Sequence, residues 1–188
     1  MFIQTELTPN PQTLKFLPGR VVMNEGTAFF QNADEASNSP FAKLLLAIDG
    51  VEGVFFGSDF ITITKSENLE WEIIKPAVLG IIMEQYETNE EIIISPNSDE
   101  SATSLKENEN DSDVVKQIKE LLDTRVRPAV AMDGGDIIYD SFDDGIVYLQ
   151  MQGACSGCPS STATLKMGIE NMLKHYVPEV KEVRPVNA

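Results

Sequence analysis

The sequence predicts an α+β protein made of two small mixed α/β domains joined by a flexible acidic linker. Strand-like alternation and helical spacing of apolar residues interleave along the chain, and a single polar, acidic stretch interrupts them. The chain has 188 residues, of which 42% are hydrophobic, which is enough for two cores of ordinary size. We therefore place domains at residues 1–94 and 112–188, with the linker at residues 95–111.

The linker is predicted from its composition. Residues 95–111 carry five acidic residues against one basic residue and few apolar ones, so the segment cannot bury enough surface to offset the entropy of ordering it. The whole chain has a formal net charge of −16. That charge argues against nucleic acid and anionic membrane surfaces as main partners, because both are polyanions.

The first domain begins with short strands. We expect them at residues 2–7, 13–17 and 26–31, and the two prolines of Thr8-Pro9-Asn10-Pro11 force an extended or turning path between the first two. A helix follows over residues 40–48, with Ser39 as its N-cap.

A hairpin and a second helix complete this domain. Its strands are expected at residues 51–56 and 60–64, around Gly57-Ser58-Asp59. The helix lies within residues 69–86. Because proline breaks a helix interior, we expect this helix to start near Lys75, with Pro76 in its first turn. No ionisable cluster in the domain suggests catalysis.

The second domain reads as an α-β-β-α-β unit. A helix capped by Asp113 is expected to end before Arg125-Val126-Arg127-Pro128. Alternating segments at residues 136–142 and 146–151 predict a hairpin. The cysteine loop, a helix over residues 160–176 and a strand at residues 180–186 follow.

The chemistry centres on the chain's two cysteines, Cys155 and Cys158. One Cys-x-x-Cys pair is too small to complete a structural zinc or iron–sulfur site within one chain, where four ligands are usual. Gly153 and Gly157 let the loop bend tightly, and Pro159 suits the opening of the next helix. We expect a solvent-facing loop whose thiolates the helix amides stabilise.

Three functions fit such a pair, and the alternative to all of them is a buried, inert pair, which the glycine, proline and helix placement disfavour. A second copy of the chain would bring two more thiolates, giving the four that a 4Fe-4S cluster requires at a homodimer interface. Four thiolates also suit a zinc-bridged structural dimer. The third is a thiol–disulfide oxidoreductase, although such enzymes carry the motif after an early strand and not late in the chain.

Other polar residues near the pair have simpler explanations. Asp133 and Asp136 flank Gly134-Gly135, a pattern typical of a tight turn rather than a metal site. His175, the single histidine, lies near the end of the last helix, where an exposed position is commoner than metal ligation. We leave all three out of the site.

Two sets of residues resemble a known family. Gly153-Ala154-Cys155-Ser156-Gly157-Cys158-Pro159, together with Met132-Asp133-Gly134-Gly135-Asp136, closely resembles the NifU-like domain of the Nfu-type iron–sulfur carriers. The run Phe2-Ile3-Gln4-Thr5-Glu6 with Leu14-Lys15-Phe16-Leu17-Pro18-Gly19 is similar to the opening of the Nfu N-terminal domain. Only the linker falls outside the resemblance.

The resemblance implies a function and its partners. Cys155 and Cys158 would ligate a labile 4Fe-4S cluster bridging a homodimer. The cluster would come from the upstream assembly machinery and pass to client apoproteins such as lipoyl synthase and aconitase-type enzymes. The implied role is that of a carrier and not of an enzyme.

The compartment is predicted from the start of the chain. Residues 1–7 lack the features of a secretory signal and of a transit peptide, and no apolar stretch approaches the ~20 residues of a membrane helix. We therefore expect a cytoplasmic bacterial protein, or a mitochondrial matrix protein if the sequence is a trimmed eukaryotic form.

Overall fold

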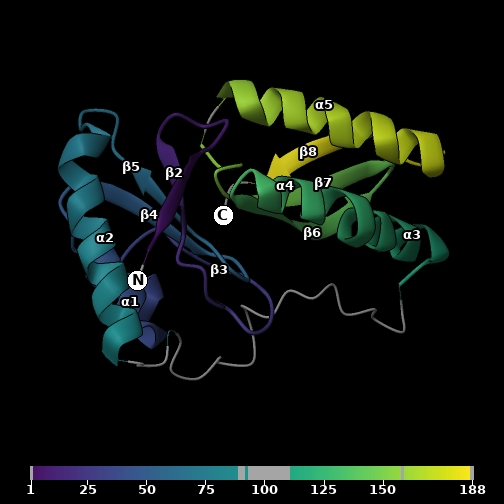
Figure 1. Ribbon diagram of the computed structural model, residues 1–188. Coiled ribbons are helices and arrows are strands. Elements are labelled where there is room, and N and C mark those ends of the chain that lie inside the picture. Colours follow the sequence, from purple (N-terminus) through teal and green to yellow (C-terminus); the bar gives the residue numbers. More distant parts are fainter. Residues whose placement is uncertain (1, 89–91, 93–110, 158, 187–188) are drawn as a thin grey trace. The chain divides into compact units, whose positions relative to one another are not determined.

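The computed structural model describes residues 2–88, 92, 111–157 and 159–186 (Figure 1). The chain divides into two compact units, Met1–Ala102 and Thr103–Ala188. Each unit has helices and its own sheet, which confirms the predicted α+β class. Of the predicted linker 95–111, all but Asp111 lies outside the described residues, so its boundaries stay a prediction.

The first unit is built on a five-stranded antiparallel sheet in the order β1-β2-β5-β4-β3. The predicted hairpin is present as β4 and β5, and a short 3₁₀ helix, η1, precedes α1. The elements are β1 (Gln4–Leu7), β2 (Thr13–Leu17), β3 (Ala28–Phe30), η1 (Glu35–Asn38), α1 (Pro40–Leu46), β4 (Val51–Phe56), β5 (Ile61–Lys65) and α2 (Trp71–Thr88).

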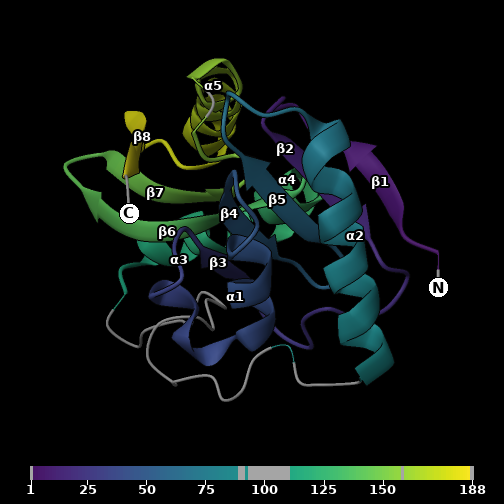
Figure 2. The ribbon, with the colours of Figure 1, turned by 90° about the vertical axis from the view of Figure 1, so that its left-hand side faces the viewer.

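The core of this unit lies between one face of the sheet and the helices α1 and α2 (Figure 2). Every second residue of the central strands points into it, as β-strand geometry requires, and Ser39 caps α1 by accepting a hydrogen bond from the Ala42 N–H. The buried sheet residues include Leu14, Phe16, Val54, Phe56, Ile61 and Ile63.

The predicted start of α2 near Lys75 is wrong, because the helix begins at Trp71 and carries Pro76 inside it. Pro76 is the sixth residue of the helix, so it lacks the N–H that would otherwise donate to the Glu72 carbonyl. Ile74 is 1% exposed in the core, and the Trp71 indole N–H donates to the Pro11 carbonyl at 3.3 Å. These contacts hold the turn before the proline.

The second unit has a three-stranded sheet in the order β6-β7-β8. Strands β6 and β7 form the predicted antiparallel hairpin, and β8 returns parallel to β7 after helix α5. The elements are α3 (Asp113–Leu121), the π-helical turn η2 (Leu122–Val126), α4 (Arg127–Met132), β6 (Gly135–Asp143), β7 (Ile146–Gly153), α5 (Pro159–Tyr176) and β8 (Glu182–Val186).

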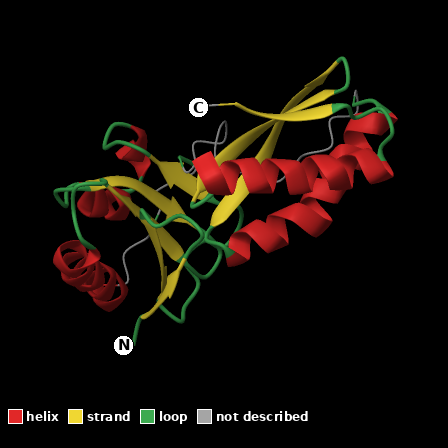
Figure 3. Ribbon diagram, turned by 90° about the horizontal axis from the view of Figure 1, so that it is seen from above, coloured by secondary structure: helices red, strands yellow, loops and turns green. Residues whose placement is uncertain are grey.

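Helices α3, α4 and α5 pack on one face of this sheet (Figure 3). The burial pattern of β7 alternates along its whole length, which identifies the face that the helices cover. Ser112, and not Asp113, caps α3 by accepting from the Val115 N–H. Within the described residues, no helix is both long enough and apolar enough to cross a bilayer.

The predicted end of the first helix before Arg125 is wrong, because helical structure continues through η2 and α4 to Met132. Pro128 lies in the first turn of α4, and the π-turn before it accommodates a residue that has no N–H. The π-turn just before it joins the two helical segments without a break.

Candidate functional site

The thiol loop, residues 153–157, leaves the end of β7 beside the start of β6. Gly153 is the strand partner of Gly135, and the Ala154 N–H donates to the Gly134 carbonyl at 3.2 Å. Within the loop, the Ser156 N–H donates to the Gly153 carbonyl at 3.1 Å. The loop is therefore fastened to the opposite strand before it reaches α5.

The glycines predicted to allow a tight bend have the expected backbone. Gly153 has φ +63° and Gly157 has φ +81°, the left-handed region in which side chains are disfavoured. Between them, the carbonyl of Cys155 accepts a hydrogen bond from the Thr162 hydroxyl on α5 at 3.3 Å. Thr162 thus fixes the backbone of Cys155 to the following helix.

Cys155 is buried, so the expectation of a solvent-facing thiol is wrong for this residue. It is 5% exposed and belongs to the core of the second unit. Gly135 packs directly on it, because a Cβ added to Gly135 would come within 2.6 Å of the Cys155 Sγ. Burial disfavours the charged thiolate of Cys155, contrary to the expectation that the helix amides stabilise it.

Burial also sets the protonation of Cys155. Burial first, and then the charges of the nearby Asp133 and Asp136 carboxylates, together raise the pKa of the thiol to about 12. The thiol is consequently neutral at pH 7. Cys158, the other predicted ligand, lies outside the described residues.

The two aspartates of the predicted turn differ. Asp133 is exposed and follows the last residue of α4, and Gly134 has φ +84°, in keeping with a tight turn. Asp136 is instead buried at 3% exposure and paired with Arg127. Sequence reasoning missed this pair, because no local spacing rule links residues nine positions apart across a helix end and a strand.

His175 is exposed beside Tyr176, and among the described residues no group of three or more histidines, cysteines or acidic residues is arranged to hold a metal ion. Within one chain, the described residues thus offer Cys155 as their single thiol. A site of four thiolates, as predicted, would need further cysteines.

Comparisons with known proteins relate the whole chain to one group. It is 54% identical over 188 residues to NifU-like protein 5, mitochondrial, of Arabidopsis thaliana, covering 97% of this chain and 67% of the relative. It is 50% identical over 189 residues to the NFU1 iron-sulfur cluster scaffold homolog, mitochondrial, of Drosophila sechellia, covering 99% and 65%. The chain thus spans about two thirds of the length of these relatives.

Two family models account for most of the sequence. The model described as scaffold protein Nfu/NifU N terminal matches residues 3–89, and the NifU-like domain matches residues 118–184. The chain belongs to the Nfu/NifU-like family. The predicted resemblance is therefore confirmed, and the thiol loop lies within the NifU-like domain.

A solved structure is also similar. The solution NMR structure of a NifU-like protein from Saccharomyces cerevisiae is 30% identical, covers 51% of this chain and 87% of its own, and has a TM-score of 0.47.

Proposed function

We propose that this chain is a scaffold and carrier for iron–sulfur clusters and not an enzyme. Its cargo is a labile 4Fe-4S cluster, held by Cys155 and Cys158 at the interface of a homodimer and passed to client apoproteins. The observation that carries the proposal is the single cysteine pair of the chain, set in the loop of a NifU-like domain. Two chains supply the four thiolates that such a cluster takes.

The burial of Cys155 adds a step to this proposal. The thiolate is the form of cysteine that binds metal. Before iron binds, the Cys155 thiol therefore has to lose its proton and move away from Gly135, which packs against it. Gly153 and Gly157 bracket the segment that has to move. Loading is then a coupled event of loop opening, deprotonation and dimerisation, and its reversal releases the cargo.

The same observation counts against a thiol–disulfide oxidoreductase. Catalytic thiols of that class are exposed and have a lowered pKa, because the thiolate is the attacking species. The pKa of Cys155 is shifted in the opposite direction. A zinc-bridged dimer uses the same ligands as the cluster, so metal analysis has to separate these two.

The names of the relatives support the compartment that we propose, and the family resemblance supports the clients. The names of the Arabidopsis and Drosophila proteins include the word mitochondrial, and we therefore favour the mitochondrial matrix over the bacterial cytoplasm that the start of the chain suggested. We propose that the clients include lipoyl synthase and aconitase-type enzymes, and that upstream assembly proteins supply the cluster.

Anaerobic reconstitution with iron and sulfide tests the proposal. We expect about four iron and four sulfide per dimer, since each chain gives two thiolates, and a Mössbauer spectrum of a 4Fe-4S cluster. Cys155→Ala is expected to abolish both the cluster and the dimer, whereas Ser156→Ala, a change within the same loop, is expected to keep them.

Three outcomes would contradict the proposal. One is wild-type protein that stays monomeric and iron-free under these conditions. Another is anaerobically isolated protein that contains zinc and no iron. The third is a loaded dimer from which no apoprotein acquires iron and sulfide.

A further inference from the structure

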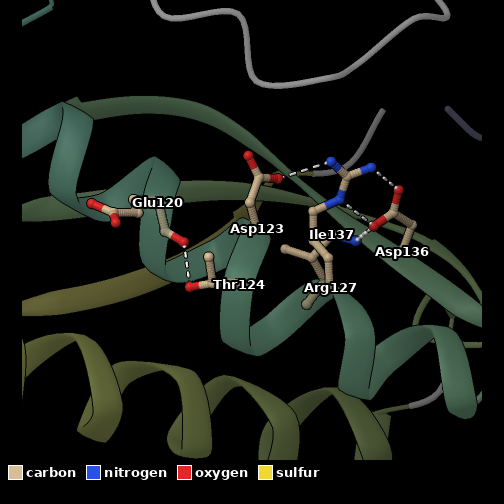
Figure 4. Close-up of polar contacts among 6 residues, drawn as sticks. All are labelled: Glu120, Asp123, Thr124, Arg127, Asp136 and Ile137. Atoms are coloured by element: carbon tan, nitrogen blue, oxygen red, sulfur yellow. Dashed lines mark hydrogen bonds and ion pairs between the residues drawn. The ribbon is translucent and has the colours of Figure 1, made fainter. Parts of the chain in front are cut away.

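A buried ion pair lies directly beside the thiol loop. The Arg127 guanidinium donates from Nε to Asp136 Oδ1 at 2.9 Å and from Nη2 to Asp136 Oδ2 at 2.8 Å, and its Nη1 donates to Asp123 Oδ1 at 2.9 Å (Figure 4). The side chain of Asp136 is 4% exposed and that of Arg127 is 19% exposed. Paired, parallel bonds of this kind fix geometry as well as charge.

The π-turn η2 explains how Arg127 reaches this position. Pro128 has no N–H, and its ring would clash with the Thr124 carbonyl in a regular α-helix. The chain widens instead, so that the Arg127 N–H donates to the Leu122 carbonyl five residues back. The Thr124 hydroxyl donates to the Glu120 carbonyl at 2.7 Å and completes the turn (Figure 4).

The wider turn also keeps the apolar side chains on the buried face of the helix. Four residues spaced four apart are all buried, whereas in a regular α-helix each of these side chains would be rotated about the helix axis by about 40° from the one before. These residues are Ile118, Leu122, Val126 and Val130. The turn therefore holds the apolar side chains inward while Arg127 extends to the strand, and π-turns are frequent at functional sites.

Asp136 connects Arg127 to the backbone that packs against the Cys155 thiol. One of its carboxylate oxygens also accepts the Ile137 N–H at 2.8 Å, which fixes the backbone at the start of β6. The preceding residue, Gly135, is the one that packs on the Cys155 Sγ. The Gly134 carbonyl holds Ala154 on the other side. A continuous chain of contacts thus runs from Arg127 through Asp136 and Gly135 to the thiol loop.

We propose that Arg127 is a positioning residue for the thiol loop, holding the start of β6 against Cys155 so that this thiol stays covered in the unloaded chain. The inference rests on the proposed function in taking Cys155 as a ligand of the cargo. In that setting Arg127 sets how readily the loop opens to accept iron, although it never touches the cargo itself.

Labelling of Cys155 by N-ethylmaleimide tests this role in the full-length, iron-free chain carrying Cys158→Ser. In Arg127→Gln we expect labelling at least about tenfold faster than in the parent, since the buried Asp136 carboxylate loses the guanidinium that is paired with it. Arg127→Lys keeps the positive charge but loses the two parallel hydrogen bonds to Asp136, so it should give a smaller increase in the labelling rate. Arg184→Gln, which breaks the exposed pair with Glu182 in the same unit, should label like the parent.

Urea dependence separates positioning from general stability. If Arg127 holds the loop locally, the faster labelling persists at low urea with little dependence on its concentration, because local opening exposes little surface. Unchanged labelling in Arg127→Gln, or an increase that follows only the globally unfolded fraction, would overturn the inference. If Arg127→Gln does not fold, the labelling rates of Arg127→Lys and Arg184→Gln, and their dependence on urea, are compared in its place.

The labelling needs no iron, so the two proposals fail separately. Wild-type protein that does not bind iron would contradict the carrier function alone. Labelling that ignores Arg127 would contradict only the positioning role.

Discussion

At the scale of single residues, Gly135 packs so closely on the Cys155 thiol that no side chain fits at position 135. A Cβ on Gly135 would lie 2.6 Å from both the Cys155 Sγ and the Gln152 carbonyl oxygen. The second of these is backbone within the β6–β7 ladder, so it cannot move aside as a flexible side chain would. The glycine therefore sets how closely the thiol loop and β6 approach.

We expect Gly135→Ala to lower the free energy of unfolding by about 1–3 kcal/mol, the usual cost of overpacking, and to speed labelling of Cys155. Gly168→Ala is the matched control, since Gly168 lies on α5 with nothing within 4 Å of an added Cβ. There the change should be neutral or stabilising by up to about 1 kcal/mol, because alanine favours a helix. Urea unfolding of both variants measures the difference, and equal effects would contradict the close contact.

At the scale of elements, the first turn of α2 shows where sequence reasoning is limited. Pro76 predicts a helix start near Lys75, but burial of Ile74 and the bond from Trp71 to Pro11 hold a turn ahead of the proline. These are contacts between residues distant in sequence, and a local rule for proline does not contain them. Tertiary packing decided the boundary.

Ile74→Ala should therefore destabilise the protein strongly, by about 2–5 kcal/mol, because it leaves a cavity in the core of the first unit. Its neighbour Ile73 is 66% exposed, and Ile73→Ala should change stability by no more than about 0.5 kcal/mol. Fluorescence of Trp71, the single tryptophan, reports urea unfolding of this unit. Similar losses for both variants would show that the turn before Pro76 does not pack as described.

The sequence contained enough to predict most elements and the family, but not the burial of Cys155. Alternation identified the β6–β7 hairpin, and Ser39 identified the start of α1. The burial of Cys155 depends on Gly135, twenty residues earlier, and the support beneath it on the pairing of Arg127 with Asp136. Such contacts arise only once the hairpin and helix have folded together.

At the scale of the whole molecule, the two units have separate cores and unequal charge. Among the residues that the structure describes, none belongs to both the buried cluster of the first unit and that of the second. Residues 1–94 carry 14 acidic and 5 basic side chains, a net −9, against 11 and 8, a net −3, in residues 112–188. The thiol loop belongs to the second unit alone. We therefore propose that the first unit has a different task, which is either recognition of clients or tuning of dimerisation.

Deleting residues 1–94 should then leave cluster binding intact while slowing cluster transfer to clients. The remaining chain keeps every residue of the second core and should bind iron and sulfide in the wild-type ratio. Its transfer to at least one client should be slower by about tenfold or more, because a tethered recognition unit raises the effective concentration of the client. Transfer is measured as recovery of client activity, with the deleted unit added in trans as a control that restores no tether. Wild-type rates for every client tested would assign the first unit some role other than recognition.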